Sequence, residues 1–99
     1  MRYEIVIARS ALADFKRLDA RRRAAVKAAM RQHLEHAPGR VSRSRIKRLR
    51  GLRQPQYRLR MDDIRVYYDV NEGDRRVEVL GFVLKPKTFD WLDKHGVPQ

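Results

Sequence analysis

Two runs of alternating apolar and polar residues, separated by a pair of aspartates, constrain the fold of this chain more than any other feature. From residue 56 to 61, and again from 64 to 70, apolar side chains occupy every second position. A period of two is typical of β-strands that bury one face. Because the polar pair Asp62-Asp63 lies between the runs, the pattern predicts a hairpin with a two-residue turn.

The hairpin fixes which side chains face each other across the two strands. Antiparallel pairing outward from the turn predicts three facing pairs: Met61 with Ile64, Arg60 with Arg65, and Arg58 with Tyr67. Directly opposed arginines repel each other, so we interpret this face as a site where guanidinium groups bind one phosphate. The ring of Tyr67 is placed to stack on an unpaired RNA base. The alternative is a solvent-facing sheet on which the arginines spread into water.

The N-terminal part of the chain predicts one strand followed by two helices. Residues 3–8 are rich in aromatic and β-branched side chains, which favours a strand. Ser10 is the expected cap of a first helix, with Asp14 in its first turns. Asp19 is the expected cap of a second helix, which runs from residue 20 to about 36. Since almost no loop separates the two helices, we expect a helical hairpin.

The C-terminal part predicts a third hairpin strand and a last short helix. Residues 77–84 are apolar on both faces, as in a central strand that is covered on both sides. Thr88 is the expected cap of the last helix. Ile46 and Leu49 are expected to point inward on a short helical turn. The predicted order is β-α-α-β-β-β-α, an α+β fold in which a single domain spans residues 1–99.

The charge of the chain is concentrated in one tract. The chain has 24 Lys and Arg against 12 Asp and Glu, a formal net charge of +12. Residues 40–60 contain nine basic and no acidic side chains, whereas residues 61–99 contain six basic and eight acidic ones. We therefore expect an anionic partner, with nucleic acid first, although such a tract is also typical of a solvated linker. The RNA-binding residues that we predict are Arg43, Arg45, Lys47, Arg48, Arg50, Arg53 and Tyr67.

Several classes of protein are excluded by what the sequence lacks. The absence of cysteine excludes disulfides and cysteine-based zinc sites. No apolar run approaches the roughly 18 residues of a membrane span, and Glu4 interrupts the opening apolar run, unlike a secretory leader. His33 and His36 do not have the spacing of the zinc protease motif. We expect a cytoplasmic domain with no metal, no other cofactor and no membrane partner.

Three short segments, in this order, resemble the central signature of the RelE/ParE toxin superfamily. They are Leu49-Arg50-Gly51, Tyr57-Arg58-Leu59-Arg60 and Ile64-Arg65-Val66-Tyr67-Tyr68. The predicted order of elements also matches that family over nearly the whole chain. The resemblance implies a RelE-like, microbial-ribonuclease-type fold, with a helical hairpin packed on a curved antiparallel sheet. It also implies a toxin of a type II toxin–antitoxin system, which cleaves mRNA on the ribosome, inhibits translation and is held inactive by a cognate acidic antitoxin.

The resemblance assigns roles to five basic residues of an endoribonuclease that transesterifies RNA through the 2′-hydroxyl. Arg58 and Arg60 correspond to basic residues on a strand, and Arg65 corresponds to the arginine that stabilises the phosphate in the transition state. Lys85 or Lys87 replaces an arginine that follows the last strand. The tyrosine or histidine that active members carry a few residues later has no counterpart at that place in this chain.

Two other functions remain open from the sequence. A ParE-like toxin, which poisons DNA gyrase, has the same fold without the ribonuclease residues, and the missing C-terminal acid favours it. A non-catalytic RNA-binding relative is the second alternative. The dense basic tract and the predicted face of Arg58, Arg60 and Arg65 favour RNA.

Overall fold

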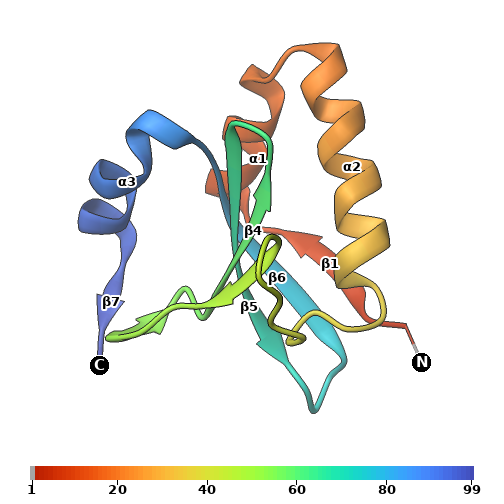
Figure 1. Ribbon diagram of the computed structural model, residues 1–99, viewed down its shortest axis with the longest axis vertical. Coiled ribbons are helices and arrows are strands. Elements are labelled where there is room, and N and C mark those ends of the chain that lie inside the picture. The colour runs from red at the N-terminus through yellow and green to blue at the C-terminus, as the bar shows by residue number, and fades with distance from the viewer. Residues whose placement is uncertain (1) are drawn as a thin grey trace.

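The computed structural model describes residues 2–99 and contains two sheets and three α-helices (Figure 1). The elements are β1 (Glu4–Ile7), α1 (Arg9–Arg17), α2 (Ala20–Leu34), β2 (Ile46–Arg48), β3 (Leu52–Gln54), β4 (Tyr57–Met61), β5 (Ile64–Asn71), β6 (Arg76–Leu84), a 3₁₀ turn (Lys85–Lys87), α3 (Thr88–His95) and β7 (Val97–Pro98). The predicted α+β fold and its order are confirmed. The structure adds three short strands, β2, β3 and β7, which sequence reasoning did not predict.

The main sheet has the strand order β1-β6-β5-β4-β2, and β3 pairs with β7 in a separate two-stranded sheet. Strand β6 lies between a parallel partner, β1, and an antiparallel partner, β5. Figure 1 shows α1 and α2 together on one side of the molecule and α3 on the other. The prediction of a central last strand is therefore confirmed for β6.

The hairpin formed by β4 and β5 has the predicted register. The three facing pairs are Met61 with Ile64, Arg60 with Arg65, and Arg58 with Tyr67. Asp62 has φ +52°, a left-handed conformation that aspartate tolerates better than most residues because its short side chain can bond the local backbone. The aspartate pair therefore forms the turn, and the arginines lie on one face.

The two N-terminal helices form as predicted, but only one of the two expected caps is present. The Asp19 carboxylate accepts a hydrogen bond from the Arg22 N–H at 2.8 Å, which confirms Asp19 as the cap of α2. The prediction for Ser10 was wrong. Helix α1 begins at Arg9, with Ala8 in the capping position and no side-chain bond, so Asp14 falls beyond the first turn. The helix follows β1 almost directly and begins two residues earlier than a cap at Ser10 would place it.

Two further local predictions were wrong, one in the type of element and one in the position of a helix cap. Residues 46–48 form β2 instead of a helical turn, because the segment pairs with the edge of β4 and buries Ile46 opposite Leu59. Thr88 is the first residue of α3 and not its cap, because the preceding 3₁₀ turn places Lys87 in the capping position. A contact with a distant strand decides the first case, and the adjacent 3₁₀ turn decides the second.

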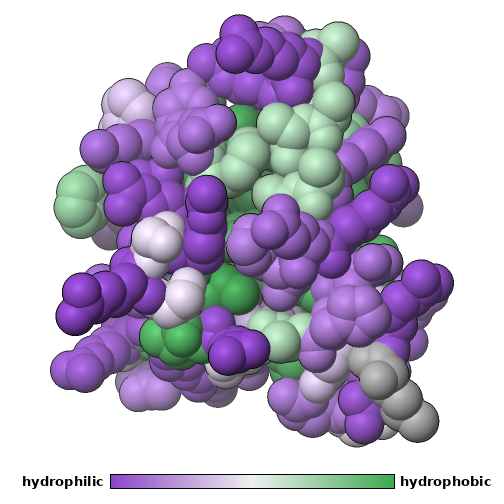
Figure 2. Space-filling model, turned by 45° about the vertical axis from the view of Figure 1, so that its right-hand side comes forward, coloured by the Kyte–Doolittle hydropathy of each residue, from purple (hydrophilic) through white to green (hydrophobic). Residues whose placement is uncertain are grey.

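The core lies between the helical hairpin and the sheet. Its fully buried side chains include Val26 and Leu34 from α2 and Leu59, Val66 and Val79 from the sheet. Hydrophilic side chains predominate on the face of the molecule shown in Figure 2. Within residues 2–99, no helix has the length and apolar character needed to cross a membrane.

A buried tyrosine in the core carries a hydrogen bond whose removal is a direct stability test. The Tyr68 hydroxyl donates to the Pro38 carbonyl oxygen at 2.6 Å, and Tyr68 is fully buried. Because Tyr68→Phe leaves a buried acceptor without a partner, we expect it to lower the free energy of unfolding by about 1–3 kcal/mol in a urea titration. Tyr57→Phe is the matched control, since Tyr57 stacks on Tyr68 but is only partly buried. Equal losses in the two variants would contradict this role of the bond.

Candidate nucleic-acid interface

The pairing of β2, β4 and β5 gathers cations on the side of the sheet that faces away from α1 and α2. Core residues alternate with outward residues on each strand, so Lys47 lies beside Arg58, and Arg60 lies beside Arg65. Arg45 lies beside Arg60 at the edge of this row, because its carbonyl accepts the Arg60 N–H at 2.8 Å and its guanidinium donates to the Arg60 carbonyl at 3.3 Å. We call these five residues, Arg45, Lys47, Arg58, Arg60 and Arg65, the basic face. No acidic side chain occupies the paired positions between them.

Arg65 is the most deeply placed cation of the basic face, with only 7 % of its surface exposed. Its Nη1 donates to the Asp62 carbonyl at 2.9 Å and to the Ile64 carbonyl at 3.1 Å, which holds the guanidinium beside the turn. Burial, reinforced by the charges of Arg58 and Arg60, lowers the pKa of Arg65. The pKa of an arginine lies so far above neutrality that the group remains charged. Arg65 is therefore a fixed, partly desolvated positive charge.

Arg58 has an unused hydrogen-bond donor inside the basic face. Its Nε is buried and has no hydrogen-bond partner among residues 2–99. A buried donor without a partner is unfavourable, and so is a cluster of like charges. Both costs fall if an anion binds there, because a phosphate offers acceptor oxygens to several guanidinium groups at once. The geometry is thus suited to binding phosphate.

The base-stacking role expected of Tyr67 does not fit the structure. The Tyr67 ring is only 2 % exposed and stacks on Trp91 of α3, with ring centroids 4.8 Å apart and planes 8° apart. Gly81 of β6 lies opposite Tyr67, and its lack of a side chain gives the indole room to pack there. Burial raises the pKa of the Tyr67 hydroxyl. Tyr67 therefore anchors α3 to the sheet and presents no free ring face to a base.

The two C-terminal lysines lie in different surroundings, and only Lys85 is next to the basic face. Both are exposed and belong to the 3₁₀ turn. The Lys85 N–H donates to the Asp63 carbonyl at 2.7 Å, which places Lys85 beside the turn that holds Arg65. Lys87 instead lines a groove of about 540 Å³ between α1 and α3, together with Trp91 and His95. The fold therefore places Lys85 beside the predicted site and Lys87 outside it.

The predicted RNA-binding tract is exposed throughout but does not form one surface. Arg43, Arg45, Lys47, Arg48, Arg50 and Arg53 are all exposed. Arg45 and Lys47 belong to the basic face, whereas the guanidinium of Arg48 lies over the ring of Tyr57, 5.0 Å from its centroid, toward the core side of the sheet. Sequence reasoning missed this division because it did not recognise β2, whose alternation separates neighbouring cations onto opposite sides.

An ion pair connects the turn of the hairpin to the helical layer. Arg22 of α2 donates to the Asp63 carboxylate at 2.7 Å and to Asp19 at 3.0 Å. Its hydrogen bonds and charge lower the pKa of both carboxyls. The folded pKa values thus lie below the unfolded ones, so this stabilisation is present above about pH 4 and is lost as the pH falls through the folded pKa.

The ion pair predicts a change in acid stability. We expect Asp63→Asn to weaken the dependence of the unfolding free energy on pH below about pH 5, because one carboxyl no longer takes up a proton on unfolding. Urea titrations at a series of pH values measure this slope. Asp93→Asn is the matched control, since Asp93 is exposed and has no ion pair within residues 2–99. An unchanged slope in Asp63→Asn would contradict the assignment.

Comparisons with known proteins identify the fold but give no match in sequence. No protein-family model matches the chain, and no curated protein matches it. Among solved structures, RelE in the archaeal RelE–RelB complex of Pyrococcus horikoshii is 24% identical, with a TM-score of 0.69, and the match covers 86% of this chain and 97% of that one.

Two bacterial structures agree with the archaeal one. A double mutant of the Escherichia coli toxin RelE in the free state is 21% identical, with a TM-score of 0.70, over 94% of this chain and 93% of that one. A chain of a RelBE toxin–antitoxin complex of Mycobacterium tuberculosis is 23% identical, with a TM-score of 0.67, over 85% and 92%. Since the matches extend over nearly the full length of each chain, this protein has the fold of the RelE toxins.

Proposed function

We propose that this chain is the toxin of a type II toxin–antitoxin system and cleaves mRNA on the ribosome, which inhibits translation. The observation that carries the proposal is the basic face, in which Arg65 is held beside Arg60 and the Nε of Arg58 is buried without a partner. The RelE fold supports the same function. Because translation takes place in the cytoplasm, this proposal implies a cytoplasmic protein.

In the proposed reaction the 2′-oxygen of a ribose attacks the adjacent phosphorus. The new O–P bond forms as the bond from phosphorus to the 5′-oxygen breaks, which gives a 2′,3′-cyclic phosphate and a 5′-hydroxyl. Negative charge accumulates on the non-bridging oxygens, where Arg65 with Arg58 and Arg60 stabilises it. Arginine retains its proton near neutral pH, so these residues act through charge, and water accepts the 2′-hydroxyl proton and protonates the 5′-oxygen.

The remaining predicted residues have supporting roles in this proposal. Lys85 adds a positive charge at the turn end of the site, and Lys87 lies farther away in the groove beside α3. The exposed cations Arg43, Arg50 and Arg53 bind the phosphate backbone of RNA without reading its sequence. Such contacts weaken as salt concentration rises, because binding releases counterions.

A cognate acidic antitoxin is the partner that we propose for regulation. The solved structures with this fold include RelE–RelB complexes from Pyrococcus horikoshii and Methanococcus jannaschii. The net charge of +12 on this chain favours association with an acidic protein.

A ParE-like gyrase poison is the second candidate function. The observation that favours it is the burial of Tyr67 under Trp91. Because the Tyr67 side chain is covered, it does not replace the C-terminal tyrosine or histidine that active ribonucleases of this kind carry after the last strand. The fold does not distinguish the two targets.

Induced expression followed by mapping of mRNA 5′ ends distinguishes the candidates. Cuts inside translated codons that disappear in Arg65→Ala support the ribonuclease. Intact mRNA together with trapped gyrase–DNA breaks would replace it with the gyrase poison. Intact mRNA, intact DNA and normal growth would leave only a non-catalytic RNA-binding protein.

A further inference from the structure

One aromatic side chain of α3 is almost completely exposed. Phe89 has 87 % of its surface exposed, more than any other large apolar side chain among residues 2–99. Its ring takes part in no aromatic pair within those residues, and α3 is held to the sheet by Trp91 instead. A phenyl ring left in water gives up the stabilisation that its burial would contribute. The fold therefore does not use the Phe89 ring, whose surface is open to solvent.

Helix α3 begins at the border of the basic face. Tyr67, on which α3 packs, lies opposite Arg58 in the hairpin. Burial raises the pKa of its hydroxyl, whereas the charges of Arg58 and Arg65 and a hydrogen bond with Thr88 oppose the rise. Thr88 is the first residue of α3, and it thus lies beside the same hydroxyl as the two arginines. Phe89 is the next residue along the helix.

The helical period places the Phe89 ring on the flank of α3 that faces away from α1. Asp90 and Lys94 line the groove beside α1 and so mark the flank that faces the helical hairpin. An α-helix turns by about 100° per residue, so Phe89 lies within about 60° of Leu92, on the opposite flank. The ring is therefore at the rim of the basic face and outside the groove.

An exposed aromatic ring next to a phosphate site is suited to a nucleobase. Single-stranded RNA is bound where cations follow its backbone and aromatic rings stack on its bases. The basic face supplies the cations, and Lys85 adds another in the turn that precedes α3. Tyr67 cannot supply the ring because it is covered, whereas Phe89 can.

We propose that Phe89 stacks on one base of a single-stranded RNA whose adjacent phosphate is bound by Arg58 and Arg65. The stack accepts any base, since every base has a π face. Phe89 is thus a positioning residue, which holds the strand beside the cations and takes no part in bond making or breaking. This inference rests on the proposed function in taking RNA as the substrate, and it adds a subsite next to the phosphate.

An NMR titration with two matched oligonucleotides tests the proposal on the whole chain without ribosomes. The first probe is a single-stranded pentanucleotide with adenine at its centre and stable abasic deoxyribose residues elsewhere. Its central ribose is 2′-O-methylated, so it has no 2′-hydroxyl and cannot be cleaved. The second probe is also abasic at the centre. Because both probes carry the same backbone charge, the difference between their affinities measures the contribution of the base.

We expect adenine to raise the affinity of the parent roughly tenfold or more, the gain typical of one base–aromatic stack, and to move the ring proton resonances of Phe89 upfield. Phe89→Ala is expected to bind the two probes equally, whereas Phe89→Trp retains the gain. Since the ring is exposed, we expect both variants to melt at nearly the temperature of the parent. Arg65→Ala is expected to weaken both probes alike, because it removes a contact with phosphate.

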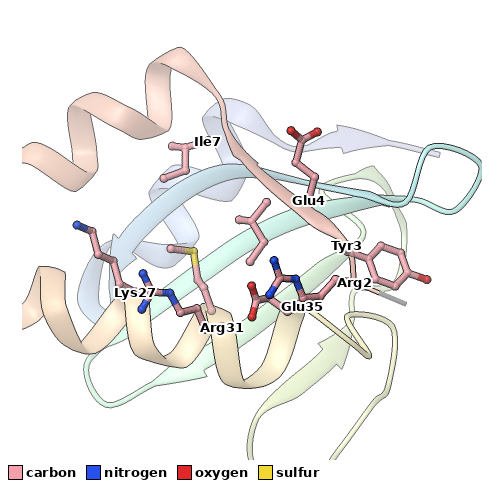
Figure 3. Close-up of a pocket in the computed structure, with 9 residues that line it drawn as sticks. Arg2, Tyr3, Glu4, Ile7, Lys27, Arg31 and Glu35 are labelled. Carbon is pink, nitrogen blue, oxygen red and sulfur yellow. The ribbon is translucent and has the colours of Figure 1, made fainter.

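The matched control is Leu12→Ala. Leu12 is another exposed apolar side chain, but it belongs to α1, on the other side of the sheet. We expect this variant to keep the full gain from adenine. A second surface is tested with Lys27→Glu combined with Arg31→Glu. These two cations line a separate groove between β1 and α2, on the helical side of the sheet (Figure 3).

Three results would overturn the proposal. They are an equal gain from adenine in the parent and in Phe89→Ala, no gain from adenine in the parent, and binding that depends on Lys27 and Arg31 in place of Arg65. A gain that is lost in Phe89→Ala, in a chain that leaves mRNA intact, would keep the stacking site and remove the proposed ribonuclease. Codon-specific cleavage without any gain from adenine would do the reverse.

Discussion

Replacing Arg65 with alanine is expected to lower mRNA cleavage by about 10²–10³-fold, the loss typical of removing one donor that stabilises charge in a transition state. Arg65 is the buried cation of the basic face, and two backbone carbonyls fix its guanidinium. Alanine removes both the charge and the paired donors. The measurement is cleavage of ribosome-bound mRNA by the purified protein, read as the rate of appearance of new 5′ ends.

Two further variants distinguish charge from structure at this position. Arg65→Lys keeps the charge but loses the forked donor geometry, so we expect a loss between those of alanine and the parent. Arg21→Ala is the control, because Arg21 is exposed on α2 and lies outside the basic face. Full cleavage by Arg65→Ala, with a melting temperature equal to that of the parent, would remove Arg65 from the mechanism.

Replacing Gly81 with alanine is expected to displace α3 from the sheet. A Cβ at Gly81 would lie 2.7 Å from Cε2 and 2.9 Å from Nε1 of Trp91, too close for the indole to remain stacked on Tyr67. Overpacking of this kind costs about 1–3 kcal/mol, and the lost aromatic pair adds about 0.5–1.5 kcal/mol. For a domain of this size, each kcal/mol lowers the melting temperature by roughly 4–8 °C.

The readout is direct because Trp91 is the only tryptophan of the chain. We expect its fluorescence emission to move to longer wavelength in Gly81→Ala as the ring becomes exposed to water. Gly73→Ala is the matched control, because a Cβ there meets only Asn71 Oδ1, at an ordinary 3.5 Å. An unchanged spectrum and an unchanged melting temperature in Gly81→Ala would show that the stack does not hold α3 in place.

The alternation of residues 56–70 was sufficient to predict which side chains lie together at the centre of the candidate site. Side chains two apart on a strand share a face whatever surrounds it, so the facing pairs of Arg58, Arg60 and Arg65 followed from local pattern and turn length alone. The same reasoning could not predict β2. Three residues are too few for a period, and Ile46 was placed by its partner Leu59, which lies 13 residues away.

Strand β6 contains a β-bulge where its pairing with β5 shifts by one residue, and no pattern in the sequence predicts its position. Val77 to Leu84 is apolar on both faces, so no alternation reveals where the pairing shifts. In the structure the shift falls between Val79 and Gly81, and an extra residue there reverses which side chains face the core. Gly81 therefore lies on the outer face opposite Tyr67, where Trp91 covers it.

The sequence by itself determined the order of the helices and longer strands, the register of the central hairpin and the common face of its three arginines, because these depend on the spacing of residues along one element. The tertiary structure alone decided which cations join that face, whether Tyr67 is free, and where an edge of the sheet stays open. Those outcomes depend on contacts between segments far apart in the chain. The open edge of β1 and the packing of Trp91 on Tyr67 are two such outcomes. Neither the charge of the chain nor its periodicity specifies them.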